Sequence, residues 1–390
     1  MAEGGAPVPA ASADLPLSAS ADLPLSALLS QALVAFTIEV DNEFEHHMSH
    51  RTTNHGATSG SGRRPWLVSL PLWSNFLRFV EDDGITVAEL SRRPGVEHWA
   101  LPGMIRWGYV TAQGGTGRAR GKQPPADAVV RLRPGGRRAK AVWSRLPDGI
   151  ERRWRQRLGD ERIDALRSAL AAVVAQADRE LPRYLPGGRY QMRLDLDRVS
   201  EPGDDGTEVA GDVAADRDLP ALLSQALLLY ATDYDRRSKA GLALDANSLR
   251  VMSAEPLRLR DLATRVGLGR ETSDVVVERM AKWGLATIEP DPSSSRGKVA
   301  RLRAEGLKAR AQYLPTAAAV EREYGARYGL RELERLRAAL LAIVEPSAER
   351  SPLWEGLEPR PEGWRAAVPA PECLPHYPLV THRGGYPDGS

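Results

Sequence analysis

Residues 257–284 read LRLRDLATRVGLGRETSDVVVERMAKWG, and this stretch decides the fold. Its apolar residues recur at helical spacing on either side of Gly267 and Gly269, which predicts two short amphipathic helices. Glycine suits the tight corner between them, because it adopts backbone conformations that other residues avoid. The stretch is therefore predicted to be a helix-turn-helix, with Val276, Val277 and Met280 on the packing side of its second helix.

The flanking residues extend this pair of helices. Residues 244–256, LDANSLRVMSAEP, predict one more helix before it. Residues 285–306, LATIEPDPSSSRGKVARLRAEG, alternate around a Pro/Ser/Gly turn, which predicts a two-stranded hairpin. Three helices followed by a hairpin is the element order of a winged helix-turn-helix.

The same unit occurs earlier in the chain. LSALLSQAL at 25–33 and LPALLSQAL at 219–227 differ only at their second position. Further matches pair Asn75 with Asn247, Gly95 with Gly267, and residues 131–139 with 301–309. Such self-similarity is the signature of a duplication. We therefore place a first copy at 23–181 and a second copy at 218–345.

Long amphipathic helices are predicted at both ends of each copy. In residues 28–48 apolar side chains recur every fourth position, with Glu39 and Glu43 mostly off that stripe. The last helix of each copy carries a similar stripe, and pairing between the terminal helices of the two copies would bury all the stripes at once. The expected fold is mainly α, with two winged helix-turn-helix domains in one chain that share a helical, dimerisation-like core.

Three segments lie outside the copies. Residues 1–22 are rich in alanine, proline and serine, and the phrase SADLPLSA starts to repeat there, which predicts a disordered leader. Residues 182–217 are rich in acidic residues, glycine and proline, and predict a solvated linker. Residues 346–390 contain nine prolines among tryptophans and tyrosines. This tail is too aromatic for a free linker, so we expect it to lie across the domain surface.

Charge is distributed unevenly along the chain. The formal net charge is +2, so the chain as a whole is not a polycation. Residues 116–155, however, hold 12 Lys or Arg against 3 Asp or Glu. This local excess favours a polyanionic partner for one face, although a solvated charged surface explains it equally well.

Catalytic and metal-binding patterns are missing from the sequence. The single cysteine, Cys373, cannot form an intramolecular disulfide. His46 and His50 have the i, i+4 spacing of a metal pair, but a polar helix end is the preferred interpretation, and no metal or cofactor is assigned. No Ser/His/Asp, Walker or dinucleotide motif is present, so an enzyme is not expected. Without a signal peptide or a membrane-length apolar run, a cytoplasmic protein is expected.

Residues 257–309 combine the helix-turn-helix, Trp283 before Gly284 at the end of its second helix, and a basic hairpin before LRAEG. With these features placed between two long helices, the chain resembles the MarR-type winged-helix transcriptional regulators. The resemblance covers about 23–345, well over the second copy and partly over the first. It implies an α-helical winged-helix dimer that binds double-stranded DNA at pseudo-palindromic operators. It also implies a small phenolic or aromatic carboxylate effector, whose binding often lowers the affinity of the protein for DNA.

Fusion of the two copies changes the expected oligomeric state. The usual member of the family is a homodimer of one copy, so a chain with both copies is expected to act as a monomeric pseudo-dimer. The linker of 36 residues spans roughly 30–36 Å as a flexible chain. Paired half-sites lie about 34–36 Å apart, which this linker permits. The sequence therefore predicts a transcriptional regulator that binds an operator through both units.

Five residues of the second copy are predicted to contact DNA. Arg270 starts the second helix of the helix-turn-helix and suits a guanine edge or a phosphate. Thr272 and Ser273 suit a phosphate near the helix N-terminus, with helix capping as the alternative. Arg296 and Lys298 in the hairpin suit phosphate or the minor groove.

The first copy departs from this pattern. Its segment VEHWALPGMIRWG, at 96–108, is four residues shorter than its counterpart and contains Pro102, which lacks an amide donor. We expect a degenerate recognition helix in which His98 and Arg106 contact DNA, so that binding is asymmetric. The longer hairpin carries the expected phosphate-contacting residues Arg118, Arg120 and Lys122.

Aromatic residues near the first helix of each copy are candidates for an effector pocket. They are Trp66, Trp73, Phe76, Tyr230 and Tyr234, with core packing as the alternative for each. The main alternative function is a winged-helix small-molecule-sensing or protein-interaction scaffold without tight DNA binding. Pro102, Glu271 and Asp274 suggest it, because a broken helix and carboxylates both weaken contact with phosphate.

Overall fold

The computed structural model describes residues 22–47, 70–96, 100–116, 123–177, 180–185, 217–344, 352–361 and 373–379. The first half contains α1 (Leu25–His47), α2 (Leu70–Asn75), η2 (Leu77–Phe79), β1 (Ile85–Thr86), α3 (Val87–Ser91), α4 (Ala100–Arg106), β2 (Val110–Gln113), β3 (Val129–Leu132), α5 (Pro134–Trp143), α6 (Leu146–Leu158) and α7 (Asp160–Val174). The second half contains α9 (Leu219–Asp235), α10 (Leu242–Leu244), η4 (Asp245–Leu249), β4 (Leu257–Arg258), α11 (Leu259–Val266), α12 (Arg270–Lys282), β5 (Ala286–Pro290), β6 (Lys298–Leu302), α13 (Ala304–Tyr328) and α14 (Leu330–Val344), and α15 (Pro352–Glu355) follows. The fold is mainly α, as the sequence predicts.

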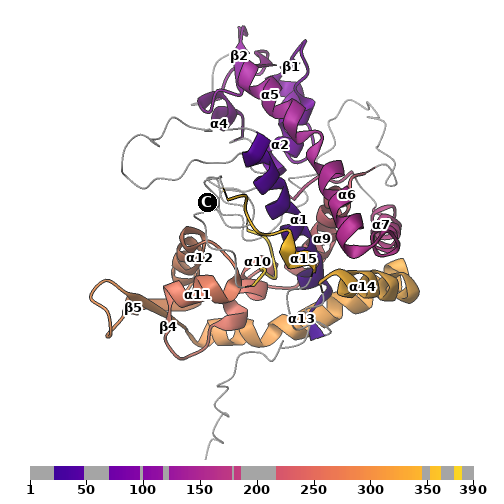
Figure 1. The fold of residues 1–390 in the computed structure, drawn as a ribbon. Coiled ribbons are helices and arrows are strands. Elements are labelled where there is room, and N and C mark those ends of the chain that lie inside the picture. Colours follow the sequence, from indigo (N-terminus) through magenta and orange to yellow (C-terminus); the bar gives the residue numbers. More distant parts are fainter. Residues whose placement is uncertain are drawn as a thin grey trace, which may run out of the picture.

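Each half contains one small antiparallel sheet with the same strand order. In the first sheet β3 lies between β1 and β2, and Val110 pairs with Leu132. In the second sheet β6 lies between β4 and β5, and Ala286 pairs with Leu302. Figure 1 shows the first sheet at the top and the second at the lower left, with long helices between them. The chain thus repeats one topology and holds its two sheets apart.

The predicted helix-turn-helix is formed by α11 and α12. α11 ends at Gly267, whose φ of 67° lies in the left-handed region that favours glycine. Val276, Val277 and Met280 of α12 are buried in the core, as expected for the packing side of this helix. The turn therefore fixes the start of α12 at the surface while its apolar stripe faces inward.

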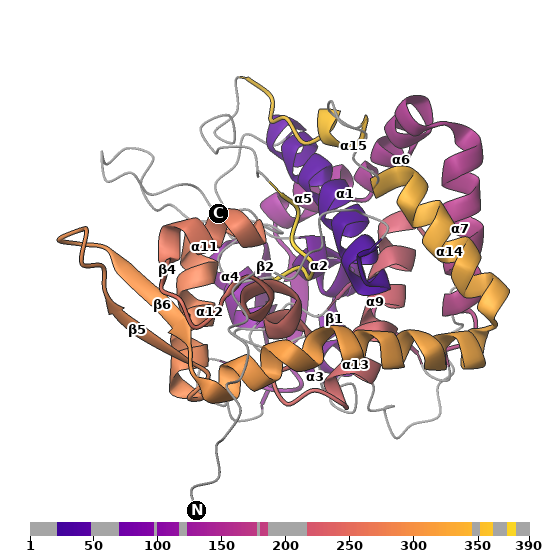
Figure 2. The ribbon, with the colours of Figure 1, turned by 90° about the horizontal axis from the view of Figure 1, so that it is seen from below.

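The long helices of the two halves form one core. α1 packs against α9 and α14, and α9 packs against α7 and α13. Figure 2 shows α7 and α14 side by side along one edge of this core, which their contacts support. Each first helix therefore contacts the last helix of the other half. Neither half buries its long helices without the other.

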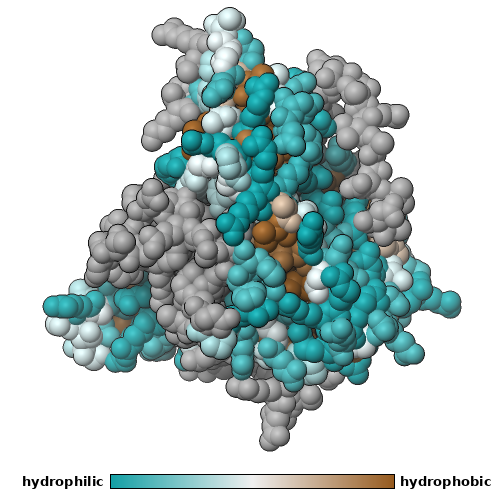
Figure 3. Space-filling model, turned by 45° about the horizontal axis from the view of Figure 1, so that its top comes forward, coloured by the Kyte–Doolittle hydropathy of each residue, from teal (hydrophilic) through white to brown (hydrophobic). Residues whose placement is uncertain are grey.

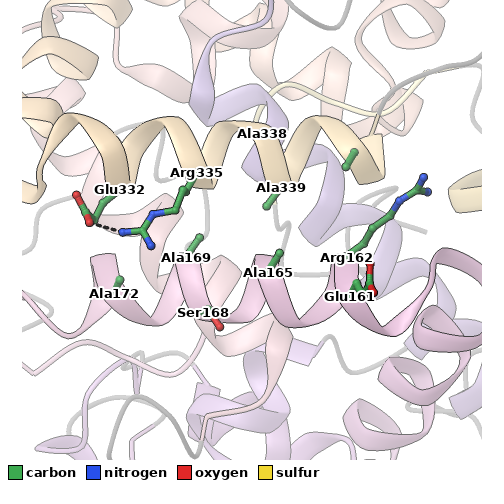
Figure 4. A pocket seen from close by; sticks show the side chains of 11 residues that line it. Glu161, Arg162, Ala165, Ser168, Ala169, Ala172, Glu332, Arg335, Ala338 and Ala339 are labelled. Carbon is green, nitrogen blue, oxygen red and sulfur yellow. Dashed lines mark hydrogen bonds and ion pairs between the residues drawn. The ribbon is translucent and has the colours of Figure 1, made fainter.

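Small side chains let α7 and α14 approach each other closely. Ala165 and Ala169 of α7 face Ala338 and Ala339 of α14 (Figure 4). Above these alanines the two helices leave a surface hollow of about 530 Å³. Ala169 and Ala339 are buried between the two helices, whereas Ala165 and Ala338 are exposed and line the hollow.

An arginine in the last long helix of each half forms the same pair of hydrogen bonds, and these connect the two halves. Arg167 of α7 donates to Glu151 of α6 and to the carbonyl of Arg217, each at 2.8 Å. The same contacts recur in the second half between Arg337, Glu321 and Leu23. Arg217 and Leu23 lie just before α9 and α1. Each arginine therefore fastens the last helix of one half to the start of the first helix of the other.

From Leu25 to Phe44 the helix α1 is buried on almost every side, including acidic residues that lie off its apolar stripe. Glu39 and Glu43 are only 3% and 5% exposed. Trp154 of α6 donates its indole N–H to Glu39 at 2.8 Å. Burial alone would raise the pKa of Glu43, but hydrogen bonds and charge from Arg153 and Arg360 hold this pKa at about 2. The carboxylates lie inside because basic side chains of α6 and of the C-terminal segment pair with them.

Parts of the expected linker and tail are packed into the fold. Tyr184 and Leu185, placed by the sequence in a solvated linker, are 1% and 3% exposed. In the tail, Leu353 of α15 and Tyr377 are also buried. The expected leader lies outside the described residues apart from Asp22. Within the described ranges, no helix combines the length and apolar character needed to cross a membrane.

Candidate nucleic-acid interface

α12 presents Arg270 to solvent but turns Thr272 and Ser273 inward. Arg270 is exposed, whereas Thr272 and Ser273 are 2% and 1% exposed. Thr272 lies four residues before Val276, and Ser273 lies four before Val277, so helical spacing puts both hydroxyls on the packing side. The expectation that these two hydroxyls face phosphate is therefore corrected.

The outward face of α12 carries charges of both signs. Arg270, Glu278 and Lys282 are exposed, and Asp274 is half-buried one turn after Arg270. Carboxylates repel phosphate, so this face is poorly suited to backbone contacts alone. An arginine beside a carboxylate instead suits base edges, because guanine offers acceptors and cytosine offers an amine donor.

The tip of the second wing is a hydrogen-bonded turn. The carboxylate of Asp291 accepts from the Ser293 amide at 2.9 Å and pairs with Arg258 Nε at 2.9 Å. Hydrogen bonds from Ser293, followed by the charge of Arg258, lower the pKa of Asp291. Arg296 and Lys298, beyond this turn, are both exposed. The wing forms the hydrophilic arm at the lower left of Figure 3.

Sequence reasoning missed Arg258 and Asp291, which hold this turn in place. Arg258 also donates to Ser293 Oγ at 2.7 Å. The phrase Asp-Pro-Ser at 291–293 carried part of the signal, since an aspartate commonly accepts from the amide two residues later. Nothing local points to Arg258, because it comes from β4, the strand that precedes the helix-turn-helix.

The counterpart of α12 in the first half is the shorter helix α4. α4 has seven residues, against thirteen in α12. Pro102 lies within α4, which is helical on both sides of it from Ala100 to Arg106. The proline therefore does not interrupt the helix, contrary to expectation. Arg106 is exposed at the end of α4, with its guanidinium 5.7 Å from the ring centre of Trp107.

Several candidate residues fall outside the described residues. They are Trp66, His98, Arg118, Arg120 and Lys122. Contacts of the first wing with DNA therefore stay predictions. The structure describes the paired strands β2 and β3 of this wing and, beyond them, the Thr116 amide, which donates to the Asp127 carboxylate at 2.7 Å.

The candidate effector-lining aromatics are core residues. Trp73, Phe76, Tyr230 and Tyr234 are 5%, 1%, 0% and 0% exposed. The ring centre of Trp73 lies 5.3 Å from that of Trp143, and Tyr230 donates its hydroxyl to the carbonyl of Ala317 at 3.2 Å. Core packing, the alternative interpretation, therefore describes these four side chains.

Three buried aromatic positions of the first half are occupied by polar residues in the second half. Where the first half has Trp73, Phe76 and Trp143, the second has Asp245, Ser248 and Tyr313. Asp245 accepts from the Tyr234 hydroxyl at 2.8 Å and from Ser238 Oγ at 2.6 Å. Burial raises the pKa of Asp245 to about 6. Within the described residues, one carboxylate oxygen of Asp245 and the hydroxyls of Ser248 and Tyr313 are buried without a hydrogen-bond partner.

Two solved structures are similar to part of this chain. One is a probable transcriptional regulator from Pseudomonas aeruginosa, at 26% identity and a TM-score of 0.28, covering 32% of this chain and 95% of that chain. The other is a MarR family transcriptional regulator from Streptomyces coelicolor, in complex with DNA, at 23% identity and a TM-score of 0.22, covering 32% of this chain and 84% of that chain. No protein-family model and no curated protein matches the chain.

Proposed function

We propose that this chain is a DNA-binding transcriptional regulator that binds an asymmetric, pseudo-palindromic operator as a single-chain pseudo-dimer. The observation that carries the proposal is the second unit, where exposed Arg270 starts α12 and exposed Arg296 and Lys298 follow the wing turn. The start of a recognition helix contacts base edges in the major groove. Cations on a wing suit the neighbouring phosphates or the minor groove.

The copies at 23–181 and 218–345 are proposed as the two halves of the pseudo-dimer. Their first and last helices pack across the halves, which supports one shared core in a single chain. A monomer is then the binding species. Light scattering of the free chain and of its complex with duplex DNA tests this stoichiometry, and two chains on one duplex would contradict it.

The two winged-helix units are proposed to have different roles in DNA binding. α12 is long enough to place Arg270 in a groove, whereas α4 has only seven residues. The second unit then reads base edges, and the first unit mainly supplies charge through Arg118, Arg120 and Lys122. This division makes the operator asymmetric.

Arg270→Ala is expected to weaken binding to the preferred duplex about tenfold, the discrimination typical of one good arginine–guanine pair. Binding to unrelated duplexes should change much less. The matched variant Arg118→Ala/Arg120→Ala should weaken binding to all duplexes alike, because phosphate contacts carry no sequence information. Electrophoretic titrations against a preferred and a scrambled duplex measure both. Equal losses on both duplexes from both variants would contradict the division of work.

Salt dependence separates the regulator from the scaffold alternative. Contact with several phosphates makes the logarithm of the association constant fall linearly with the logarithm of the salt concentration. The duplex to use is the promoter region next to the gene of this protein. If the chain binds no DNA even at low salt, the sensing or interaction scaffold is the better interpretation.

A small aromatic effector with hydrogen-bonding groups is proposed for the second half. The buried polar atoms of Asp245, Ser248 and Tyr313 that lack partners within the described residues support this location. Aromatic rings fill the matching positions of the first half. We expect hydroxybenzoates to raise the thermal unfolding midpoint and to weaken DNA binding. Ser248→Phe, which introduces the residue of the first half, should abolish both effects, and an unchanged response would contradict the site.

A further inference from the structure

The pattern Leu-Pro-X-Tyr occurs twice, at Leu181–Tyr184 and at Leu374–Tyr377. The first copy of the pattern follows α7 and the second follows α14, each the last long helix of its half. Both tyrosines are buried, at 1% and 6% exposure. The duplication therefore extends beyond the helices into segments that the sequence assigned to the linker and the tail.

Each segment forms a two-way hydrogen bond with one asparagine of its own half. Asn75 Nδ2 donates to the carbonyl of Tyr184 at 2.9 Å, and the Tyr184 amide donates to Asn75 Oδ1 at 3.2 Å. Asn247 and Tyr377 repeat this arrangement at 2.8 and 3.2 Å. Asn75 and Asn247 occupy matching positions in the two copies. A carboxamide can satisfy both backbone groups of one residue, so these bonds fix the segments in place.

Each segment also lies against a helix-turn-helix corner. A Cβ on Gly267 would come within 2.2 Å of the carbonyl oxygen of Cys373, and a Cβ on Gly95 within 2.8 Å of Pro182. The Cys373 thiol lies 3.3 Å from the carbonyl of Thr264 in α11. Glycine at these two corners therefore serves the close approach of the segment as well as the turn.

The other side of each segment reaches the first helix of the other half. The Leu185 amide donates to Ser224 Oγ of α9 at 3.4 Å. Ser30 Oγ of α1 donates to the carbonyl of Pro375 at 2.8 Å. Ser30 and Ser224 are the serines of the duplicated phrase LLSQAL. A hydroxyl can accept in one half and donate in the other, which explains a serine inside an apolar stripe.

We propose that the two Leu-Pro-X-Tyr segments are straps that position the helix-turn-helix units, each strap fastening the unit of its own half to the first helix of the other half. Two closed straps hold both units at a fixed distance and angle on the shared core. An open strap frees its unit from that geometry. The consequence for DNA rests on the proposed function, whereas the fastening itself does not.

Cys373, the single cysteine of the chain, is half-buried and directly precedes the second strap. Its thiol donates to the carbonyls of Thr264 and Arg265 at 3.3 Å, so opening of the strap frees the thiol for labelling. We would measure the rate of thiol labelling of the full-length chain in wild type, Asn247→Ala and Ser30→Ala. Each variant removes hydrogen bonds that hold the second strap, and labelling should become about tenfold faster. Asn75→Ala removes the same bonds from the first strap and should leave the rate unchanged.

Duplex DNA supplies the second measurement. Because coupling between two equilibria is reciprocal, a duplex that prefers the closed strap slows the labelling of Cys373. Asn247→Ala weakens the binding of that duplex to the extent that the variant leaves the strap open in the free chain. If wild type binds no DNA, the proposed function fails, and the labelling rates still decide about the strap. Equal labelling rates in wild type, Asn247→Ala and Ser30→Ala would overturn the fastening, and a bound duplex that leaves the wild-type labelling rate unchanged would overturn its coupling to DNA. If circular dichroism shows Asn247→Ala unfolded, Ser30→Ala carries both comparisons.

Discussion

Replacing Glu39 with alanine is expected to lower the free energy of unfolding by about 3–5 kcal/mol, the loss typical of removing one partner from a buried ion pair. Glu39 is 3% exposed in the middle of α1. Its carboxylate accepts from Trp154 Nε1 at 2.8 Å and from Arg157 Nη1 at 3.2 Å. In the variant the Arg157 guanidinium stays largely buried and loses the Glu39 carboxylate with which it pairs. Urea unfolding followed by far-ultraviolet circular dichroism measures the difference.

Glu305→Ala is the matched control for this prediction. Glu305 pairs with Lys308 on the surface of α13, where the side chains are 67% and 72% exposed. Such exposed pairs contribute less than about 1 kcal/mol, so the control should barely change the unfolding midpoint. If Glu39→Ala costs no more than Glu305→Ala, the buried pair does not stabilise the shared core.

The burial of Glu39 shows where sequence reasoning about the core reaches its limit. The apolar residues of α1 repeat every fourth position, and that local pattern was enough to predict the helix. The partners of Glu39 come from α6, more than a hundred residues later in the chain. No local pattern links an acidic residue to an indole and a guanidinium at that separation, so the sequence places Glu39 off the apolar stripe but does not indicate its burial.

The sequence likewise predicts only part of the candidate DNA interface. Helix-turn-helix and wing follow from patterns within about fifty residues, and they were predicted from 257–309. The inward turn of Thr272 and Ser273 was also available from the sequence, because each stands four residues before a valine of the packing side. Their residue types favour phosphate contacts, whereas their helical positions place them on the packing side.

The sequence indicates the two straps only weakly. LPRY at 181–184 and LPHY at 374–377 share three of four letters, and so short a match stands out only once the longer duplication is aligned. Composition pointed the other way, because proline and glycine around each segment indicate a linker or a tail. The burial of both segments depends on Asn75 and Asn247, which are distant in sequence.

Removing both wing cations in Arg296→Ala/Lys298→Ala is expected to weaken binding to any duplex about 60-fold near 0.1 M salt, with the salt slope smaller by about 2. Each cation that neutralises a phosphate releases counterions, so losing two contacts changes both the affinity and its dependence on salt. The turn built by Asp291, Ser293 and Arg258 stays in place, because neither substitution removes a contact that holds it. Fluorescence anisotropy with one duplex at several salt concentrations gives both quantities.

Arg301→Ala/Lys308→Ala removes the same net charge from the same half and is the matched control. Arg301 pairs with Glu289 at 2.7 Å, and Lys308 pairs with Glu305 at 2.7 Å. These cations already have carboxylate partners, so their loss should change affinity through the net charge alone, by a few-fold, and leave the salt slope nearly unchanged. Equal slopes in the two double variants would mean that the wing tip does not touch phosphate. In that case the exposed cations beyond the turn are a solvated surface, and contact with DNA has to come from α12 or from the first unit.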